Sequence, residues 1–422
     1  MADDNPSTDG VPARRAALQM LDAVLRRGRT LDSAAQGARG LSGADHAFAI
    51  AMSGEVLRRL PALDALIDSA TSKRLPDDSK ARMVLRLALA QKIGLGTPDH
   101  ALVATALPLV DGGPRRLVHG VLGTLLRRGI PGEDASPLPE EVEARWADAW
   151  GDATIDSARR QIANRPPLDL SFKSDAAAAA FAAAKGGVSL APRHVRLDDA
   201  GAVADLSGFG DGGWWVQDLA ASIPARLAPG GGEVLDLCSA PGGKAMQLAA
   251  AGHSVTALDS SGRRLERLRE NLDRTGLSAR LVTADALNWT PPKLQAAVLL
   301  DAPCSATGTF RRHPEVLYRA RPRIIAEMAE LQARLIDSAA AMVAPGGSLV
   351  YAVCSLEPRE GEAIVRDFLS RNAAFRTDPP RPGELPDFIV PDSAGWVRIL
   401  PGLLEAQGGL DGFFAARLVR AA

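Results

Sequence analysis

Apolar residues recur at helical spacing through the first third of the chain. In the segment RRAALQMLDAVLRR, for example, Ala17, Leu21 and Val24 fall on one helical face. Prolines and glycines separate this segment from later ones, and no strand-like alternation interrupts the series. The pattern predicts a disordered tail at residues 1–10 and an all-helical domain over residues 11–130. Its later helices are expected at residues 45–60, 61–70, 81–94, 100–109 and 115–128.

From residue 233 onward, short apolar segments alternate with amphipathic helical ones. Alternation of this kind predicts a doubly wound α/β sheet. We expect a Rossmann-like domain over residues 219–422, with a seven-stranded, mostly parallel sheet. Its strands are expected at residues 233–238, 254–259, 279–284, 296–301, 348–353, 396–400 and 412–419. Its helices are expected at residues 244–251, 262–275 and 323–343.

The segment between these two regions reads as a linker followed by a third unit. Residues 131–140 are acidic and rich in proline, as linkers are. After them come helix-like segments, an alanine-rich helix in DAAAAAFAAAKGG and strand-like runs. We therefore predict a small α+β unit over residues 141–218, in which at least one of Trp214 and Trp215 is a core residue. A chain of 422 residues has room for these domains.

Composition excludes several classes of protein. The chain is 46% hydrophobic and 23% charged, which is usual for a folded globular protein. No apolar run approaches the roughly 18 residues that a membrane span needs. The acidic, polar N-terminus resembles no secretory or transit signal. Three widely spaced cysteines indicate a reducing compartment instead of a disulfide framework, so we expect a cytoplasmic protein.

The charge is unevenly distributed along the chain. Residues 11–130 hold 18 Lys and Arg against 10 Asp and Glu, although the whole chain has a net charge of −1. A basic domain on a nearly neutral protein indicates an anionic partner such as nucleic acid. A well-solvated helical surface would show the same charge, and the charge alone does not separate the two.

The sequence EVLDLCSAPGGK, residues 233–244, predicts a strand, a glycine-rich turn and the start of a helix. In a doubly wound sheet, such a turn lies at the carboxyl end of a strand, where these folds bind nucleotide-like ligands. Glycines would let the backbone approach the ligand closely. A phosphate loop is excluded, because that pattern requires glycine where Cys238 stands and Ser or Thr where Ala245 stands.

Acidic residues stand at or near the ends of four successive predicted strands. They are Asp236, Asp259, Asp285 and Asp301. Single acids at such positions can be turn or capping residues, but four indicate a polar ligand along the sheet edge. An acid after the second strand can bind ribose hydroxyls. A ligand with ribose hydroxyls, an adenine amine and a positive charge fits this set, so we predict S-adenosylmethionine as the cofactor.

Two cysteines follow the predicted fourth and fifth strands. Cys304 and Cys354 are each followed by serine, and adjacent parallel strands would bring both to one edge beside the cofactor. A lone free cysteine is often a small buried hydrophobe. No cysteine or histidine pair has the spacing of metal ligands, so we expect no metal ion.

A thiolate is a good nucleophile for a pyrimidine ring. Its addition to carbon-6 of cytosine makes carbon-5 reactive toward a sulfonium methyl group. The proton on carbon-5 must then leave and the thiol must be expelled, and a second group can assist this release. Asp301, two residues before Pro303, is placed to stabilise charge at ring nitrogen-3.

These segments resemble the Sun (NSUN-type) family of RNA cytosine-carbon-5 methyltransferases. The resemblance rests on DLCSAPGGKA, ALDSSGRRLERLRENLDRTG, DAPCSATGTFRRHPEV, YAVCSLEPREGE and DGFFAARLVR. In the helical region, ARMVLRLALAQKIGLGTPDHALV and RRLVHGVLGTLLRR resemble the RNA-binding NusB domain. Together they are similar to the bacterial type that methylates 16S ribosomal RNA. The resemblance implies an RNA partner, ribosomal RNA in particular. We also expect a monomer that binds no membrane.

The resemblance also implies roles for individual residues. Cys354 is expected to be the attacking nucleophile, and Cys304 is expected to assist product release. The residues implied to contact S-adenosylmethionine are Cys238, Ser239, Ala240, Pro241, Gly242, Gly243, Lys244, Asp259, Asp285 and Asp301. By this resemblance, Arg311-Arg312-His313-Pro314 would either hold RNA phosphate or position the active-site loop. The residues alone would also fit a solvated loop without a function.

The chain departs from the family pattern at a few positions. Ala245 replaces the usual Thr, Ala306 the usual Gly, Val353 the usual Thr and Gly361 the usual Asn. His119-Gly120 and Gly123 depart from the NusB pattern. These departures leave a second hypothesis open, a non-catalytic RNA-binding ribosome assembly factor. A DNA cytosine methyltransferase is disfavoured, because those enzymes use the cysteine after the fourth strand and do not need Cys354.

Overall fold

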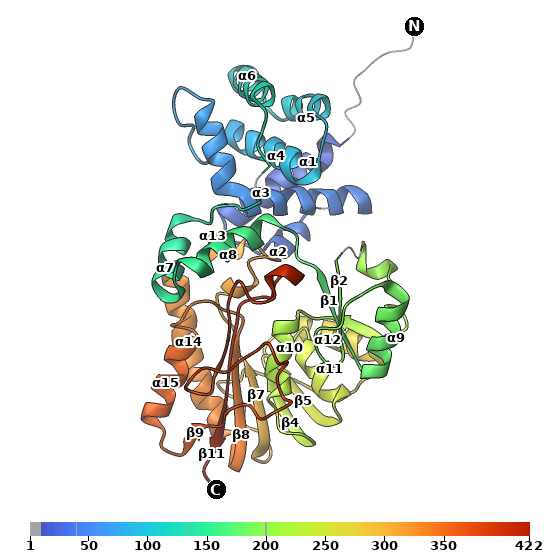
Figure 1. Ribbon diagram of the computed structural model, residues 1–422, viewed down its shortest axis with the longest axis vertical. Helices are drawn as coiled ribbons and strands as arrows, with labels where there is room; N and C mark the ends of the chain where they lie inside the picture. Colours follow the sequence, from blue (N-terminus) through green and yellow to red (C-terminus); the bar gives the residue numbers. More distant parts are fainter. Residues whose placement is uncertain (1–9, 39, 133, 199–200) are drawn as a thin grey trace. The chain divides into compact units, whose positions relative to one another are not determined.

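The computed structural model describes residues 10–38, 40–132, 134–198 and 201–422. Residues 1–9 of the predicted tail lie outside the described residues. The chain forms two compact units (Figure 1). The helical unit contains residues up to Arg165 together with Phe310–Arg319, and the sheet unit contains Pro166–Thr309 and Ala320–Ala422. The division therefore does not follow the predicted boundaries at 130 and 140, because the two helices after the linker group with the helices before it.

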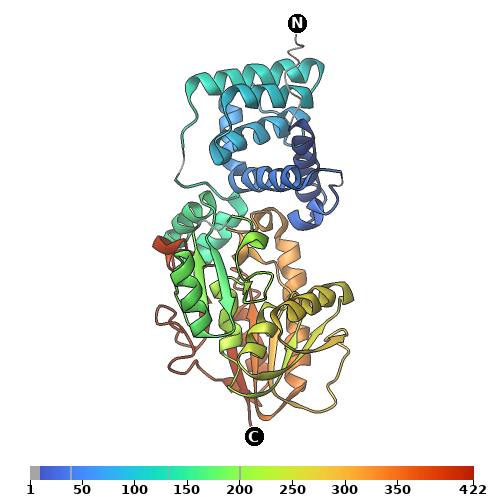
Figure 2. The same cartoon turned by 90° about the vertical axis from the view of Figure 1, so that its right-hand side faces the viewer.

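The helices within residues 11–128 of the helical unit (Figure 2) pack around one apolar core. Met20, Leu57, Leu85 and Leu122, from four different helices, are all buried in this core. The helices are α1 (Val11–Leu25), α2 (Leu31–Ala35), α3 (Gly43–Ser69), α4 (Lys80–Leu95), α5 (Asp99–Ala106), α6 (Gly112–Arg128), α7 (Glu140–Trp150), α8 (Asp152–Ala163) and α13 (Val316–Arg319).

The helices expected separately at residues 45–60 and 61–70 form one helix, because α3 continues through Pro61. Proline has no N–H to donate to the carbonyl four residues earlier, which leaves the Leu57 oxygen without its helical partner. The Tyr318 hydroxyl donates to that oxygen at 2.8 Å, and the buried Ser136 hydroxyl donates to the neighbouring Arg58 oxygen at 3.3 Å. The Tyr318 side chain, distant in sequence, thus replaces the missing helical hydrogen bond.

Residues 310–319 come from the second half of the chain but belong to the helical unit. The Phe310 ring packs edge-on against Trp146 at 5.4 Å, and Arg311 is only 1% exposed. The Arg311 carbonyl accepts a hydrogen bond from Arg58 Nη1 at 2.8 Å. Glu315 accepts one from the Leu31 N–H at 3.2 Å. Within the segment for which two roles are predicted, Arg311 and Pro314 are buried, whereas Arg312 and His313 are partly exposed.

Several basic residues of the helical unit are used inside it. Arg82 is fully buried and pairs with Asp68 at 2.7 Å, and Arg86 holds both oxygens of Asp64 at 2.7 and 2.8 Å. Other arginines stay exposed, among them Arg115, Arg116, Arg127 and Arg128 on α6. The surplus of positive charge predicted from the sequence is therefore only partly available to a partner.

The sheet unit is built on the mixed sheet that the sequence predicts. The strand order is β10-β11-β8-β7-β4-β5-β6, and the short strand β9 pairs with β11 as an eighth strand. Strands β8, β7, β4, β5 and β6 are parallel, and β9, β10 and β11 are antiparallel additions. The strands are β4 (Gly232–Leu237), β5 (His253–Asp259), β6 (Arg280–Thr283), β7 (Gln295–Asp301), β8 (Val343–Val353), β9 (Phe375–Thr377), β10 (Val397–Ile399) and β11 (Phe413–Arg420).

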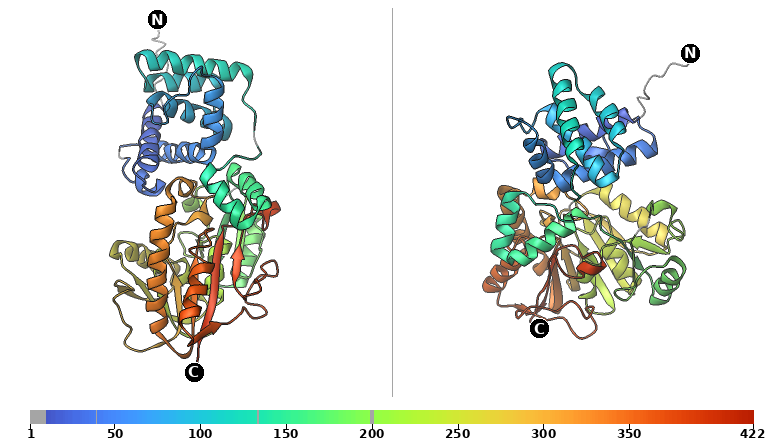
Figure 3. Two further views of the ribbon diagram at one scale, coloured as in Figure 1. Left: turned by 90° about the vertical axis from the view of Figure 1, so that its left-hand side faces the viewer. Right: turned by 45° about the horizontal axis from the view of Figure 1, so that its top comes forward.

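Helices cover both faces of this sheet, as the alternating pattern predicts. Leu268 of α12 and Met246 of α11 lie in the core on one face. Leu335 of α14 and Phe368 of α15 lie in the core on the other face. Figure 3 shows the ribbon from two further sides, with helices on both faces of the sheet. The helices are α10 (Leu219–Arg226), α11 (Gly243–Ala250), α12 (Gly262–Thr275), α14 (Pro322–Ala341) and α15 (Glu362–Arg371).

A small antiparallel sheet, in the order β2-β1-β3, also belongs to the sheet unit. Its strands are β1 (Leu168–Phe172), β2 (His194–Leu197) and β3 (Trp214–Val216), and α9 (Asp175–Lys185) packs against it. Both Trp214 and Trp215 are buried, which confirms the predicted core role. Among the described residues, no helix has the length and apolar character to cross a bilayer.

Asp236 is a fully buried acid in the central strand β4. Its Oδ2 accepts a hydrogen bond from the Ser239 hydroxyl at 2.5 Å, whereas its Oδ1 has no partner among the described residues. Burial raises the pKa of this carboxyl to about 7, and the nearby charges of Asp301 and Asp259 act in the same direction. The residue is therefore part of the fold's interior and not an exposed ligand at the strand end.

We predict that Tyr318→Phe lowers the free energy of unfolding by about 1–2 kcal/mol, because the Leu57 oxygen loses its donor. In a Pro61→Ala background, residue 61 regains an N–H for that oxygen, so the same change should cost less than half as much. Urea unfolding of the four proteins in this double-mutant cycle measures the coupling. Equal costs in both backgrounds would contradict the assigned hydrogen bond.

We predict that Asp236→Asn becomes more stable relative to the wild type as the pH rises from 4 to 8. The folded-state pKa of about 7 lies above the unfolded value of about 3.9, so the folded wild type binds the extra proton. Its stability must fall as the pH rises through this window. The difference should grow by on the order of 2–4 kcal/mol. Urea unfolding at several pH values tests this, with Asp273→Asn, at an exposed position, as the matched control.

Candidate active site

Parallel pairing aligns the carboxyl ends of the central strands. Leu237 of β4 lies opposite Leu258 of β5 and Leu300 of β7, and Asp301 lies opposite Ala352 of β8. The residues that follow these positions therefore meet at one edge, around a cavity of about 360 Å³. Its lining includes eight of the predicted site residues: Cys238, Ala240, Pro241, Asp259, Asp285, Asp301, Cys304 and Cys354. The other predicted residues, Ser239, Gly242, Gly243 and Lys244, are not among its lining residues.

The glycine-rich turn is shaped by packing. Gly242 has φ of 106°, a conformation that side chains rarely adopt, and a Cβ there would overlap Leu268 of α12. We expected the glycine to permit close approach of a ligand, but its neighbour is the helix. Cys238 also has a positive φ, of 59°, and burial raises the pKa of its thiol to about 12. Cys238 therefore remains a neutral thiol in the turn.

Lys244 is directed at the predicted catalytic acid. Its Nζ donates to Asp301 Oδ2 at 2.7 Å and lies 5.2 Å from the centre of the Phe413 ring. Burial disfavours the ammonium form of Lys244, but the Asp301 carboxylate outweighs burial and raises the lysine pKa. Both groups are thus held as an ion pair at the cavity wall.

Asp259 and Asp285 differ in their surroundings. Asp259 is buried and accepts hydrogen bonds from the Ala240 N–H at 3.2 Å and the Ser261 N–H at 2.9 Å. Arg264 pairs with it at 3.3 Å and also bonds the Ala240 carbonyl. Asp285 is exposed, and its carboxylate accepts from the Leu287 N–H at 3.0 Å. Asp259 therefore fixes the turn, while Asp285 lies outside the sheet core at the cavity's rim.

The two cysteines face each other, with their sulfur atoms 3.5 Å apart. The Cys354 carbonyl accepts from the Gly308 N–H at 3.1 Å, which joins the two loops through the backbone. A Cβ at Gly308 would overlap the Gly412 carbonyl, so this approach requires glycine. The hydrogen bond with Cys354 raises the pKa of Cys304 well above its ordinary value, and burial and the charge of Glu360 add to this shift.

Two departures from the family pattern have visible structural consequences. Ala306 has φ of 59°, the left-handed region that favours the usual glycine, so the Cys304 loop carries backbone strain of about 1 kcal/mol. A Cβ at Gly361 would meet Arg398 and Phe414, and the Arg398 guanidinium lies 5.0 Å from the Phe414 ring centre. The absence of a side chain at Gly361 therefore leaves room for the stacked Arg398 and Phe414 side chains.

Sequence reasoning missed the polar network behind the cysteines. Glu360 lies within the segment quoted for the resemblance, but no spacing or periodicity distinguishes it from neighbouring acids. In the structure its carboxylate accepts from Ser305, Ser355 and Gln332. The serine that follows each cysteine was the available signal, although it does not indicate the common acceptor.

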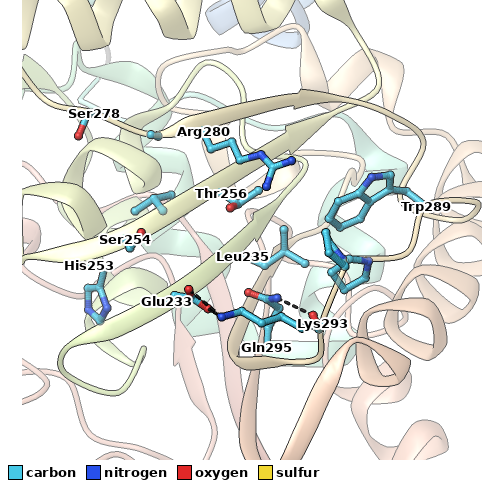
Figure 4. Close-up of a pocket in the computed structure, with 14 residues that line it drawn as sticks. Glu233, Leu235, His253, Ser254, Thr256, Ser278, Arg280, Trp289, Lys293 and Gln295 are labelled. Atoms are coloured by element: carbon cyan, nitrogen blue, oxygen red, sulfur yellow. Dashed lines mark hydrogen bonds and ion pairs between the residues drawn. The ribbon is translucent and has the colours of Figure 1, made fainter.

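A second cavity, of about 560 Å³, lies at the opposite edge of the sheet (Figure 4). Its lining includes the first residues of β5, β6 and β7, which are His253, Arg280 and Gln295, and Trp289 from the loop before β7. Lys293 pairs with Glu233 there, at 2.8 Å. None of the predicted site residues lines this cavity. Size alone therefore does not identify the reactive site.

Within the described part of the chain, no group of three or more His, Cys, Asp or Glu residues is arranged to hold a metal ion. The chemistry of the 360 Å³ cavity is that of carboxylates and thiols. Acids at its wall and rim suit ribose hydroxyls and a positive charge, and this donor set fits the predicted S-adenosylmethionine.

Two families match the chain in succession. Residues 11–127 match the NusB family, and residues 225–419 match the family described as 16S rRNA methyltransferase RsmB/F. These matches confirm the predicted order of a NusB-like helical domain and a Rossmann-like methyltransferase domain.

Curated relatives extend over nearly the whole chain. The ribosomal RNA small subunit methyltransferase B of Xanthomonas campestris is 36% identical, with 98% of each chain covered. The protein of the same name from Thermus thermophilus is 35% identical, with 89% of each covered.

Solved structures share the fold. The crystal structure of PH0851 has a TM-score of 0.72 at 22% identity, with 98% of each chain covered. The structure of NSun6 from Pyrococcus horikoshii with SFG has a TM-score of 0.57 at 16% identity, covering 68% of this chain and 99% of that one. Because its relatives match from end to end at more than 30% identity, this chain belongs to the ribosomal RNA small subunit methyltransferase B family.

Proposed function

We propose that this protein transfers a methyl group from S-adenosylmethionine to carbon-5 of a cytosine in small-subunit ribosomal RNA. The names of its relatives support the substrate class. The observation that carries the chemistry is the pair of thiols, 3.5 Å apart, in the cavity that the strand-end acids line. S-adenosylmethionine, when bound, supplies the methyl group as an electrophilic sulfonium.

Cys354 is the proposed nucleophile. Its sulfur forms a bond to carbon-6 of the cytosine, which gives carbon-5 the electron density to take the methyl group. Asp301, held by Lys244 through one of its oxygens, would stabilise charge at ring nitrogen-3 during this addition. The target base must leave any helical stack to reach the sulfur.

Cys304 is proposed to assist release. After methyl transfer, the proton on carbon-5 passes to solvent water. The electron pair of that C–H bond re-forms the ring double bond as the bond between carbon-6 and the Cys354 sulfur breaks. The raised pKa of Cys304 keeps its thiol protonated, so it can donate to the departing sulfur across 3.5 Å. Without this donor, the covalent protein–RNA intermediate should persist.

RNA binding is proposed to involve the helical unit. Its NusB-family match and the exposed arginines of α6 support this role. The cofactor would be held at the Cys238–Lys244 turn and by Asp259, Asp285 and Asp301, which surround or support the cavity.

We predict that Cys354→Ser reduces methyl transfer by at least about 10³-fold, because an alcohol is a far weaker nucleophile than a thiolate. Transfer of labelled methyl groups to small-subunit RNA measures the rate, and calorimetry should show unchanged S-adenosylmethionine binding. A variant with normal turnover would exclude Cys354 as the nucleophile.

We predict that Cys304→Ser leaves methyl transfer possible but causes a covalent protein–RNA complex to accumulate. Denaturing gel electrophoresis with labelled RNA detects the complex as a band of reduced mobility. The double variant with Cys354→Ser is the control and should show no such band. Normal turnover without the complex would refute the release role.

For the substrate, we predict that a strain lacking this protein loses one methylated cytosine from its small-subunit RNA. Bisulfite mapping detects the site, and the intact gene should restore it. Assays on naked RNA and on assembled subunits then identify the form that is methylated. If every methylated cytosine persists, the substrate assignment is wrong.

A further inference from the structure

Glu360 occupies the space between the loops that carry the two thiols. It is completely buried, and it lies on the turn that follows Cys354. Its backbone carbonyl accepts a hydrogen bond from the Tyr351 hydroxyl at 2.6 Å, which ties this turn back to β8. The backbone from which the Glu360 side chain extends is therefore held in place.

The carboxylate collects donors from both cysteine loops. Oε1 accepts from the Ser305 N–H at 2.8 Å, and Oε2 accepts from the Ser305 hydroxyl. Oε2 also accepts from the Ser355 hydroxyl at 2.5 Å. Ser305 directly follows Cys304 and Ser355 directly follows Cys354, so one carboxylate bonds the next residue after each thiol.

A third element braces the same group. Gln332 of α14 donates to Glu360 Oε1 at 3.2 Å and to the Pro303 carbonyl at 2.8 Å. No ion pair to Glu360 occurs among the described residues, so hydrogen bonds alone offset its desolvation. Burial accordingly raises the pKa of Glu360. Burying a carboxylate without a neighbouring cation costs desolvation free energy. The donors that offset this cost come from the two cysteine loops and α14, and their position indicates the role of Glu360.

We propose that Glu360 is a positioning residue that ties the two cysteine loops together and keeps the thiols of Cys304 and Cys354 within reach of one pyrimidine ring. The hydrogen bonds to Glu360 support the claim that it joins the two loops, and only the reference to the pyrimidine rests on the proposed function. Two cysteines that follow separate strands can react with the same ring only if their loops keep a fixed position relative to each other. A shift of about 1 Å at a reacting group is enough to cost about 100-fold in rate.

The test uses the rate of disulfide formation, which reports how readily the two sulfur atoms meet and does not depend on RNA. Diamide removes two electrons and two protons from a pair of thiols, which leaves a disulfide and a hydrazine. In the full-length protein, mass spectrometry of peptides should detect the Cys304–Cys354 bridge. We expect Glu360→Ala to slow its formation at least 10-fold. Methyl transfer should show a similar fall in kcat, with KM for S-adenosylmethionine changed less than 3-fold.

Three further variants separate positioning from general stability. Glu384→Gln is the matched control, because it removes a carboxylate from the buried Arg417 at 2.8 Å, outside the cysteine loops. It should lower Tm and leave the rate of disulfide formation within 2-fold. Glu360→Gln, which keeps the size and one acceptor, should partly restore the rate. The double variant Ser305→Ala/Ser355→Ala removes the hydroxyl donors and should slow the reaction even if Glu360→Ala does not fold.

A folded Glu360→Ala protein, or a folded double-serine variant, that forms the disulfide at the wild-type rate would overturn the proposal. Failure of the proposed function gives a different result. If Cys354→Ser still methylates RNA while disulfide formation still depends on Glu360, the cysteine chemistry is wrong and the positioning role stands.

Discussion

The parallel pairing of β7 with β8 is the constraint on which the site depends. It places Asp301 opposite Ala352, so that the chain leaves both strands at the same edge and in the same direction. Parallel strands buried on both faces, as these are, cannot slip without moving every side chain to the wrong face. This register and the backbone hydrogen bond from Gly308 to Cys354 bring the two cysteine loops together, and their sulfur atoms lie 3.5 Å apart.

Part of the chain between Cys304 and α14 belongs to the helical unit. Residues 305–309 belong to the sheet unit and lie beside Cys354, whereas Phe310 to Arg319 pack among the helices. Phe310 fills space against Trp146, and Tyr318 supplies the hydrogen bond that Pro61 cannot make. The helical unit is thus completed by a segment that directly continues the Cys304 loop, and its fold is inseparable from the second half of the sequence.

Much of the architecture was predictable because it follows local patterns. Strand–helix alternation predicted the central sheet, to which the described residues add the three-residue strand β9, too short to leave a periodic signal. Leu265, Leu268 and Leu272 are buried as the amphipathic pattern of α12 predicts. The division at 140 was less predictable, because a proline-rich segment indicates a loop but does not show on which side the following helices pack. Gly242 shows the same limit, since a glycine required by a neighbouring helix looks identical to one required by a ligand.

The order of the domains, the two cysteines and the strand-end acids could be read from the amino-acid sequence, because residue type and spacing along one strand–turn–helix unit specify these features locally. The burial of Asp236, the pairing of Lys244 with Asp301 and the joining of the cysteine loops by Glu360 became visible only in the folded chain. These relations join residues from different strands and turns. Their energies depend on burial and on distances of about 3 Å, which exist only after the sheet has formed.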